Sequence, residues 1–476
     1  MKRRYTILIM AVSWLLCACQ TTPATHAVVN KNDGTFDANL IISSSEHYDS
    51  ASQAIVYSDE FSSTDNSVEF EIDIDTVLST TAMPAVEVVP HYINETEAQR
   101  VAKALFGNAV FYDLDQTLSK DEIMQCITRW MPLASTDAMR ELFPANSEDA
   151  IEWRVDQLKN SIESFTHAYE EAPADNPHSP CQWKFRKDSF YTGISDVNGE
   201  NDSIEATTTV DEIPYKLSIS VRNRNDYKLN AIFAYPREFI MLDQAIFRAT
   251  HCRTVKPSNL QIEEISQRAE KILEQIDIGE WKIDECYLNS NDNGEYVICI
   301  NAVPVLNGVP AIRLPQLNNL KSENAYASNY YLSNVSFKFS PNGDLLFFEF
   351  QSPVDVSDVL NENTAVLRPA DILQKAKETL SLSDIYAYDY DGIVDLSRET
   401  DVNVGCKVSL NKIKYNLIRV KKPNTDDYYY YVPGYLFGGS IELFDKSTGA
   451  ILSYFEDINL LALNAVDGSI VYMNNE

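Results

Sequence analysis

The C-terminal half of this chain presents the same order of elements twice, a helix followed by a run of strands. In the first copy, apolar residues from Ile262 to Ile276 recur at helical spacing, and strand-like segments follow as far as Gln351. In the second copy, Pro369 opens a helical pattern, and strand-like segments follow as far as Tyr472. The copies share this order and not their residues, which indicates an internal repeat of structure.

Strands that follow one another without intervening helices are typical of antiparallel sheets. The dipeptides Asn342-Gly343 and Asp467-Gly468 are strong hairpin signals within the two copies. A parallel sheet would instead alternate strand and helix. The chain is therefore predicted to be α+β, with helices packed on one face of curled antiparallel sheets and a helix-then-strands unit repeated in the C-terminal half.

The N-terminal half mixes strands with capped helices. Residues 68–75 alternate apolar and acidic side chains, which predicts a strand with one buried and one exposed face. Asn94 and Glu97 form a capping-box pattern for a helix over 98–106. Further helices are predicted up to Trp130 and from Ser147 to Phe165, followed by antiparallel strands over 181–190, 203–223 and 227–235.

The first residues carry the features of a bacterial lipoprotein signal. Lys2, Arg3 and Arg4 precede an apolar run, and Leu16-Cys17-Ala18-Cys19 has the pattern of a lipobox. Cys19 is therefore predicted to receive a diacylglyceryl group and to anchor the mature protein to the extracytoplasmic face of the cell membrane, where two acyl chains suffice. The alternative is an ordinary signal peptide in which Cys19 occurs by chance.

These patterns divide the chain into five predicted segments. A lipoprotein signal peptide over 1–18 and a lipid tether over 19–35 precede the folded part. At about 150 residues per domain, the remainder corresponds to about three units. They are an N-terminal α+β domain over 36–245 and two α+β repeats over 246–362 and 363–476.

The chain is strongly acidic. Its net charge of −31 becomes −34 once the signal is removed, because the signal contains three basic residues and no acidic ones. This balance argues against nucleic acid as a partner and against electrostatic adsorption to an anionic membrane. The acidic residues are scattered, as on an ordinary soluble surface, although a cationic partner would also suit them.

No motif in the chain identifies a reaction, because signatures for dinucleotides, phosphate loops, zinc proteases and nucleophile elbows are absent from the sequence. Glu163 and His167 lie four residues apart on a predicted helix but lack a second histidine nearby. Residues 289–294 resemble the start of a calcium loop, but position 12 is Ile300 instead of glutamate. The sequence therefore predicts no catalytic residue, no metal site and no cofactor.

A hairpin is predicted from residues 281–288 and 295–303, which flank an Asn-rich turn. If the hairpin is centred on that turn, Cys286 and Cys299 lie opposite each other, within the distance that a disulfide bridges. A disulfide between them is one prediction, and a different register with two thiols is the alternative.

An aromatic run near the C-terminus is the candidate ligand or partner surface. In a strand, alternate tyrosines face opposite ways, so one set would pack on the core and the other would line a surface. Tyrosine suits peptide or glycan contact. The alternative is a strand covered on both faces. The candidate residues are Tyr428, Tyr429, Tyr430, Tyr431, Tyr435 and Phe437.

Several stretches resemble a family of uncharacterised lipoproteins from clostridial-type Gram-positive bacteria. They are residues 28–34, 70–75, 86–90, 105–107, 118–122, 431–435 and 463–470. In that family a Trp-x-Phe-like stretch usually follows the Val-Pro segment, and here it is Gly434-Tyr435-Leu436-Phe437. The closing module also resembles PepSY-type domains and the extracytoplasmic regulators of a cell-wall histidine kinase. These resemblances imply binding and regulation, and they supply no catalytic residues.

Three functions are therefore considered. The first is a lipid-anchored binding or regulatory protein, without catalytic activity, that contacts a protein, peptide or cell-wall component. The second is a solute-binding lipoprotein of a transporter, which normally has two lobes with parallel sheets. The third is a surface hydrolase that uses paired carboxylates about 5–10 Å apart.

Overall fold

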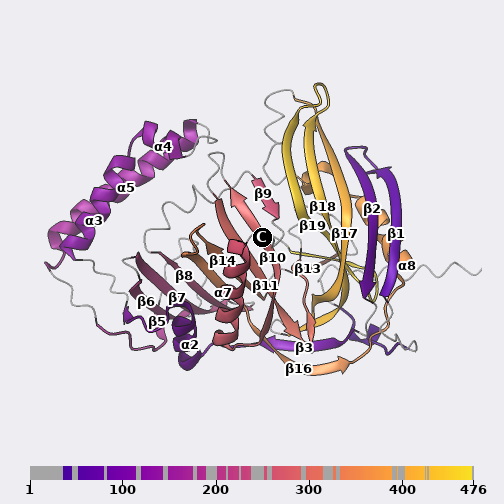
Figure 1. The fold of residues 1–476 in the computed structure, drawn as a ribbon, viewed down its shortest axis with the longest axis horizontal. Coiled ribbons are helices and arrows are strands. Elements are labelled where there is room, and N and C mark those ends of the chain that lie inside the picture. Colours follow the sequence, from indigo (N-terminus) through magenta and orange to yellow (C-terminus); the bar gives the residue numbers. More distant parts are fainter. Residues whose placement is uncertain are drawn as a thin grey trace, which may run out of the picture.

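The computed structural model contains two large curled sheets with helices packed against them (Figure 1). The structure is mostly antiparallel sheet with a few helices, which confirms the predicted α+β class. Residues 1–35, and with them Cys19, the signal and the tether, lie outside the described residues. The residues that the structure describes are 36–44, 52–79, 83–113, 119–142, 148–174, 179–188, 201–210, 213–224, 227–236, 251–254, 260–290, 296–314, 325–328, 333–388, 394, 402–423, 425 and 428–473.

One sheet has eleven strands in the order β4-β6-β7-β8-β15-β14-β11-β10-β9, with β5 paired to β6 and β12 paired to β11. All of these pairings are antiparallel. The strands are β4 (Tyr112–Asp113), β5 (Arg186–Asp188), β6 (Asn201–Val210), β7 (Ile213–Arg224), β8 (Tyr227–Pro236), β9 (His251–Thr254), β10 (Glu280–Ser290), β11 (Tyr296–Leu306), β12 (Val309–Pro310), β14 (Asn334–Phe339) and β15 (Leu345–Gln351).

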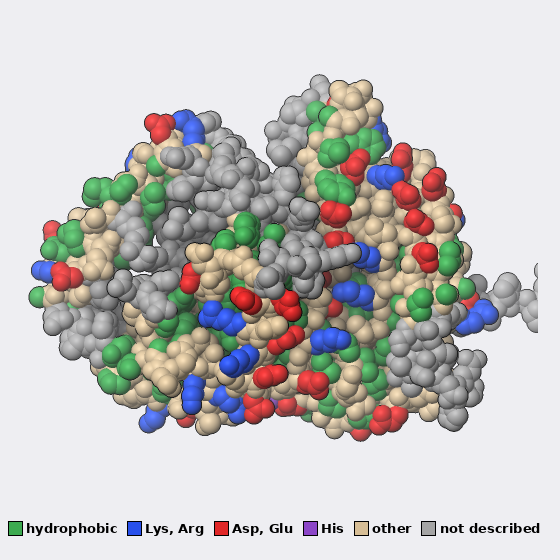
Figure 2. Space-filling model, in the orientation of Figure 1, with side chains coloured by type: hydrophobic (Ala, Val, Ile, Leu, Met, Phe, Trp, Pro, Cys, Tyr) green, Lys and Arg blue, Asp and Glu red, His purple; other side chains and the backbone are tan. Residues whose placement is uncertain are grey.

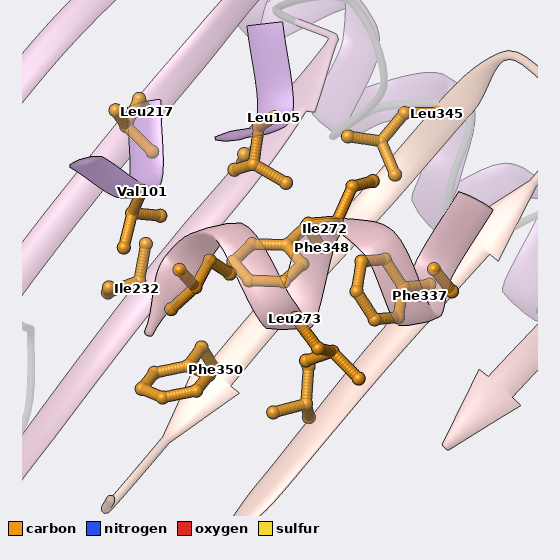
Figure 3. Close-up of a cluster of buried hydrophobic side chains, with 14 of the residues drawn as sticks. Val101, Leu105, Leu217, Ile232, Ile272, Leu273, Phe337, Leu345, Phe348 and Phe350 are labelled. Atoms are coloured by element: carbon orange, nitrogen blue, oxygen red, sulfur yellow. The ribbon is translucent and has the colours of Figure 1, made fainter. Parts of the chain in front are cut away.

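Helices α2 (Glu95–Phe106) and α7 (Leu260–Ile276) pack on one face of the eleven-stranded sheet and close its core. The predicted capping box is confirmed, because Asn94 accepts from the N–H of Glu97 and the Glu97 side chain accepts from the N–H of Asn94. The side chains that meet in Figure 3 are Val101 and Leu105 of α2, Ile272 and Leu273 of α7, and Leu217, Ile232, Phe337, Leu345, Phe348 and Phe350 of the sheet.

The other sheet has nine strands in the order β1-β2-β17-β18-β19-β20-β13, with β3 paired to both β16 and β18. Its two parallel pairings among the described strands are β2 with β17 and β13 with β20. The strands are β1 (Ser52–Ser62), β2 (Val68–Ser79), β3 (Ala85–Pro90), β13 (Ala325–Ser328), β16 (Val354–Asn361), β17 (Val404–Lys421), β18 (Tyr429–Asp445), β19 (Ile451–Asn464) and β20 (Ile470–Met473).

Strand β2 has the two-faced character that its sequence predicts. Its apolar residues Val68, Phe70, Ile72 and Ile74 are at most 2% exposed. They share a core with the buried face of helix α8 (Pro369–Leu380), whereas the acidic residues between them lie on the outer face. In Figure 2, Asp and Glu side chains gather at the upper right, over β1 and β2.

Three helices form a separate group beside the eleven-stranded sheet (Figure 1). They are α3 (Lys120–Trp130), α4 (Thr136–Leu142) and α5 (Glu148–Glu171), which bury a small core of their own. Short 3-10 turns occur at η1 (Ala38–Leu40), η2 (Met131–Leu133) and η3 (Ile385–Tyr388). In the described part of the chain, no helix combines the length and apolar content that a membrane span requires.

The two C-terminal copies have the predicted order. Helix α7 precedes β10, β11, β14 and β15, which are consecutive neighbours in one sheet, and α8 precedes β17 to β20, which are consecutive neighbours in the other. Strands from the N-terminal range complete both sheets, since β8 pairs with β15 and β2 pairs with β17. Whether the predicted domain ranges fold independently stays a prediction.

Candidate functional site

The predicted aromatic surface is buried in the structure. Tyr429, Tyr430, Tyr431, Tyr435 and Phe437 are each at most 5% exposed, whereas Tyr428 is 40% exposed. Strand β18 lies in the interior of its sheet, between β17 and β19, so neither of its edges is open.

Both faces of β18 are covered by apolar side chains. Tyr429 and Tyr431 belong to a cluster with Val86 of β3 and Leu306 of β11. Tyr430 packs in a second cluster, its ring 6.3 Å from that of Phe36, and Tyr435 and Phe437 lie in the core beneath α8. The surface prediction is therefore wrong for these five residues, and the alternative of a strand covered on both faces is confirmed.

The predicted disulfide is also wrong. The β10–β11 hairpin forms, but its register shifts between Ile283 and Glu285. This shift pairs Cys286 with Ile300 and Cys299 with Tyr287. A shift of one residue turns a side chain to the opposite face, so the two sulfurs point away from each other. Both cysteines accordingly carry thiols.

The face of the eleven-stranded sheet opposite α2 and α7 carries polar and aromatic side chains. On β15, for example, Phe348 and Phe350 enter the core, whereas Glu349 between them belongs to the other face. We call this surface the polar face, and each of its side chains is buried or half-buried. Its residues are Ser203, Glu205, Thr207, Lys216, Ser218, Ser220, Phe233, Tyr235, Phe347, Glu349, Gln351, Asn334, Ser336 and Lys338.

One transverse row crosses the polar face and continues over β11 and β10. Its three glutamates recur every third strand, so their Cα atoms are about 14 Å apart at a strand spacing of about 4.8 Å. The residues in register, strand by strand, are Glu205, Ser218, Phe233, Glu349, Ser336, Asn301 and Glu285.

At one end of the row, Glu205 is paired with a cation. The Nζ atom of Lys216 lies 2.6 Å from Glu205 Oε2, and the Ser218 hydroxyl donates to the same carboxylate. Burial raises the pKa of the nearby Tyr235, and Lys216 opposes this only in part. Tyr235 therefore keeps its hydroxyl proton and can donate a hydrogen bond to a ligand.

At the other end, Glu285 is paired with Arg313, whose Nη1 lies 3.3 Å from Oε2. Asn301 donates to Glu285 Oε2 at 3.2 Å, and Asn459 of β19 donates to Oε1 at 3.2 Å. Since β19 belongs to the nine-stranded sheet, Glu285 connects the two sheets. The row therefore ends at a charge-neutral contact between them.

Glu349 lies in the middle of the row. Burial raises the pKa of its carboxyl group, and the more distant charges of Arg313 and Lys338 oppose this only in part. The Gln351 side-chain amide donates to the carboxylate. Two aromatic rings accompany Glu349 on this face, Phe233 and Phe347, with centroids 6.4 Å apart.

The polar face combines carboxylates, cations, hydroxyls, amides and aromatic rings. These groups can form hydrogen bonds and ion pairs with a polar ligand, and the rings provide contact area. The residues named for this face include serines but no cysteine or histidine, and the Ser218 hydroxyl donates to the Glu205 carboxylate. Within the described ranges, no three His, Cys, Asp or Glu side chains come together as a metal site.

Sequence reasoning did not single out this surface. Alternation within 334–339 and 345–351 indicates a polar face on each strand. The alignment of seven strands into one row depends on pairings between residues far apart in the sequence, such as Phe233 with Glu349, and no local pattern encodes these.

His91 forms a second titratable cluster, at the junction of the two sheets. Its Nδ1 lies 2.9 Å from Asp355 Oδ2 on β16, and its Nε2 lies 3.1 Å from Glu97 Oε1 on α2. Arg100, with Nη2 3.7 Å from Glu97, donates to the carbonyl of Ile276 at the end of α7. A protonated His91 thus bridges carboxylates from both sheet systems.

We expect His91→Gln to lower stability more at pH 6 than at pH 8.5. Burial alone would lower the pKa of His91, but Asp355 and Glu97 outweigh it and raise the pKa above its ordinary value of 6.5. A raised pKa gives stability that is full below pH 6.5 and is lost as pH rises through the folded-state pKa. Melting temperatures across pH 5.5–9 test this, and an equal loss at both pH values would contradict it.

Comparisons with known proteins assign this chain to no family, because no family model matches it and no curated protein is significantly similar to it. An uncharacterised protein from Eubacterium rectale ATCC 33656 is similar over 86% of this chain and 91% of its own, at 12% identity and a TM-score of 0.33. The YpeB C-terminal domain of Bacillus megaterium is similar over 56% of this chain and 92% of its own, at 14% identity and a TM-score of 0.21.

Proposed function

We propose that this chain is a lipid-anchored extracytoplasmic binding protein that holds a short peptide, free or as part of the cell wall, on the polar face. In this proposal the protein has no catalytic activity, cofactor or metal, and it regulates or presents what it binds. Its buried tyrosine strand is part of the scaffold.

The observation that carries the proposal is the row from Glu205 to Glu285, whose side chains are half-buried except for the buried Asn301. Fixed hydroxyl and amide groups beside aromatic rings provide hydrogen bonds and contact area with little loss of side-chain freedom. Ser336, for instance, donates to Asn301 Oδ1 at 2.8 Å and accepts from Asn334 at 3.1 Å, so its orientation is set before a ligand arrives. Peptide groups would find both donors and acceptors along the row.

The spacing of the row supports binding over hydrolysis. A glycoside hydrolase needs two carboxyl groups about 5–10 Å apart on opposite sides of one bond. The glutamates of the row are about 14 Å apart at their Cα atoms, and the outer two are occupied by Lys216 and Arg313. The antiparallel sheets likewise support a binding or regulatory protein over a two-lobed solute-binding protein of a transporter.

The cellular location in this proposal follows from the sequence. The lipobox at Cys19 supports export and attachment to the outer face of the membrane. The resemblance to Firmicute lipoproteins and to PepSY-type modules supports a regulatory or binding role. The acidic net charge fits a peptide or wall partner better than nucleic acid.

Binding to the polar face is testable with two matched aromatic truncations. Phe347→Ala removes a ring from the polar face, whereas Tyr454→Ala removes a 46% exposed ring from β19 in the other sheet. The probes are a pool of synthetic heptapeptides without aromatic residues and a muramidase digest of peptidoglycan, which separate a free peptide from a wall peptide. We expect wild type and Tyr454→Ala to bind one probe equally, and Phe347→Ala to bind about tenfold more weakly. If wild type binds neither probe, or if the two variants weaken binding alike, the proposal is wrong.

A further inference from the structure

The three glutamates of the row differ in how their charge is neutralised. Glu205 and Glu285 each have a Lys or Arg nitrogen within 3.3 Å. Glu349 accepts a hydrogen bond from the Gln351 amide. Among the described residues it forms no ion pair, and the charges of Arg313 and Lys338 act on it only from farther away. The middle carboxylate is thus the one whose charge no contacting cation balances.

The surroundings of Glu349 make this imbalance costly. Its side chain is half-buried between Phe233 of β8 and Ser336 of β14, which lie in register on either side. A desolvated carboxylate is stabilised strongly by a cation that reaches it, because water no longer screens the pair. Phe347, whose ring is already 5.1 Å from Lys338 Nζ, offers a second surface that attracts cations.

We infer that Glu349 is the recognition residue for a primary ammonium on the ligand, so that the bound peptide is one that presents a lysine-type side chain to the middle of the row. This inference rests on the proposed function and names its ligand class. Charge complementarity is the reason for this choice of ligand. An ammonium group would neutralise Glu349 in the way that Lys216 neutralises Glu205 and Arg313 neutralises Glu285. An extended peptide rises about 3.3 Å per residue. Three residues on either side of the lysine therefore extend about 10 Å along the row, toward its two neutral ends.

An unbalanced carboxylate should also weaken the folded protein. Burial raises the pKa of Glu349 above its ordinary value of 4.5. A carboxyl group with a raised pKa is neutral in both states at low pH, and it costs stability as pH rises through its unfolded-state pKa. Glu349→Gln is therefore expected to melt higher than wild type at pH 7.5 and equally at pH 4. The ligand-free protein would then be less stable than it could be, as is common at binding sites.

The test compares two heptapeptide pools that differ in one group. Both have blocked termini and neutral, non-aromatic flanking residues, and the central residue is lysine in one pool and acetyl-lysine in the other. The proteins are wild type, Glu349→Gln, Glu349→Asp and the control Glu442→Gln, which changes a half-buried glutamate of β18 in the other sheet. Affinities are measured by fluorescence anisotropy at low and high salt.

We expect wild type and Glu442→Gln to prefer the lysine pool at least tenfold. We expect Glu349→Gln to bind both pools alike and Glu349→Asp to keep part of the preference. Equal binding of both pools by wild type would overturn the inference and leave the proposed function standing. If wild type binds neither these pools nor the peptidoglycan digest, the proposed function and the inference about Glu349 are both wrong. A preference that persists in Glu349→Gln, whose folding the melting curve reports, would assign the ammonium to another residue.

Discussion

Replacing Phe348 with alanine is expected to lower the free energy of unfolding by about 3–5 kcal/mol, the usual cost of removing a buried aromatic ring. Phe348 is fully buried, and its ring lies 5.0 Å from that of Phe337 and 6.5 Å from that of Phe350. It lies beneath α7, where sheet and helix side chains interdigitate (Figure 3). Because the rigid sheet cannot close around the cavity, the lost contacts and the empty volume both lower the free energy of unfolding.

The neighbouring Phe347 provides a matched control. It belongs to the polar face and is half-buried, so Phe347→Ala removes the same ring from the opposite side of the strand. We expect a loss of about 1 kcal/mol or less. Urea unfolding followed by tryptophan fluorescence measures both variants. Similar losses of stability for Phe347→Ala and Phe348→Ala would contradict the structure, in which Phe348 lies in the core and Phe347 lies on the opposite face of the sheet.

Replacing Cys19 with alanine is expected to move nearly all of the protein from the membrane fraction to the soluble extracytoplasmic fraction. Loss of the thiol would remove the predicted acceptor of the diacylglyceryl group, and with it the acyl chains on which the proposed anchoring depends. Cys17→Ala serves as the control, because it lies before the predicted cleavage point and should leave the anchor intact. Cell fractionation and incorporation of an alkyne fatty acid measure the outcome. Cys19→Ala protein that stays at the membrane would contradict the predicted anchor.

Local patterns in the sequence predicted the elements of the fold well. The capping box at Asn94, the alternation of β2 and the helical stripe of α7 all depend on residues within a few positions of one another, and the structure confirms each. The same holds for the order of helix and strands in the two C-terminal copies. These features arise from backbone hydrogen bonding and side-chain periodicity, which the sequence displays directly.

Features that depend on pairing between distant strands could not be predicted. A one-residue shift between Ile283 and Glu285 separates Cys286 from Cys299, and no turn signal reports such a shift. The first tyrosines of β18 are buried because β3 pairs along the edge of the strand and the segment near Leu306 packs against it, and both segments lie far away in sequence. The row through Glu349 likewise exists only after seven strands align. Register across a sheet is set by long-range packing, which a single sequence does not show.

The most direct measurement of the proposed function is hydroxyl-radical footprinting of the native protein with and without the lysine heptapeptide pool. Ligand on the polar face should slow the oxidation of Tyr235 and Phe347 at least threefold and leave Tyr454, on β19 of the other sheet, unchanged. If the peptide binds while Tyr235 and Phe347 react as before, or while Tyr454 becomes the protected ring, then the polar face is not the binding surface of this protein.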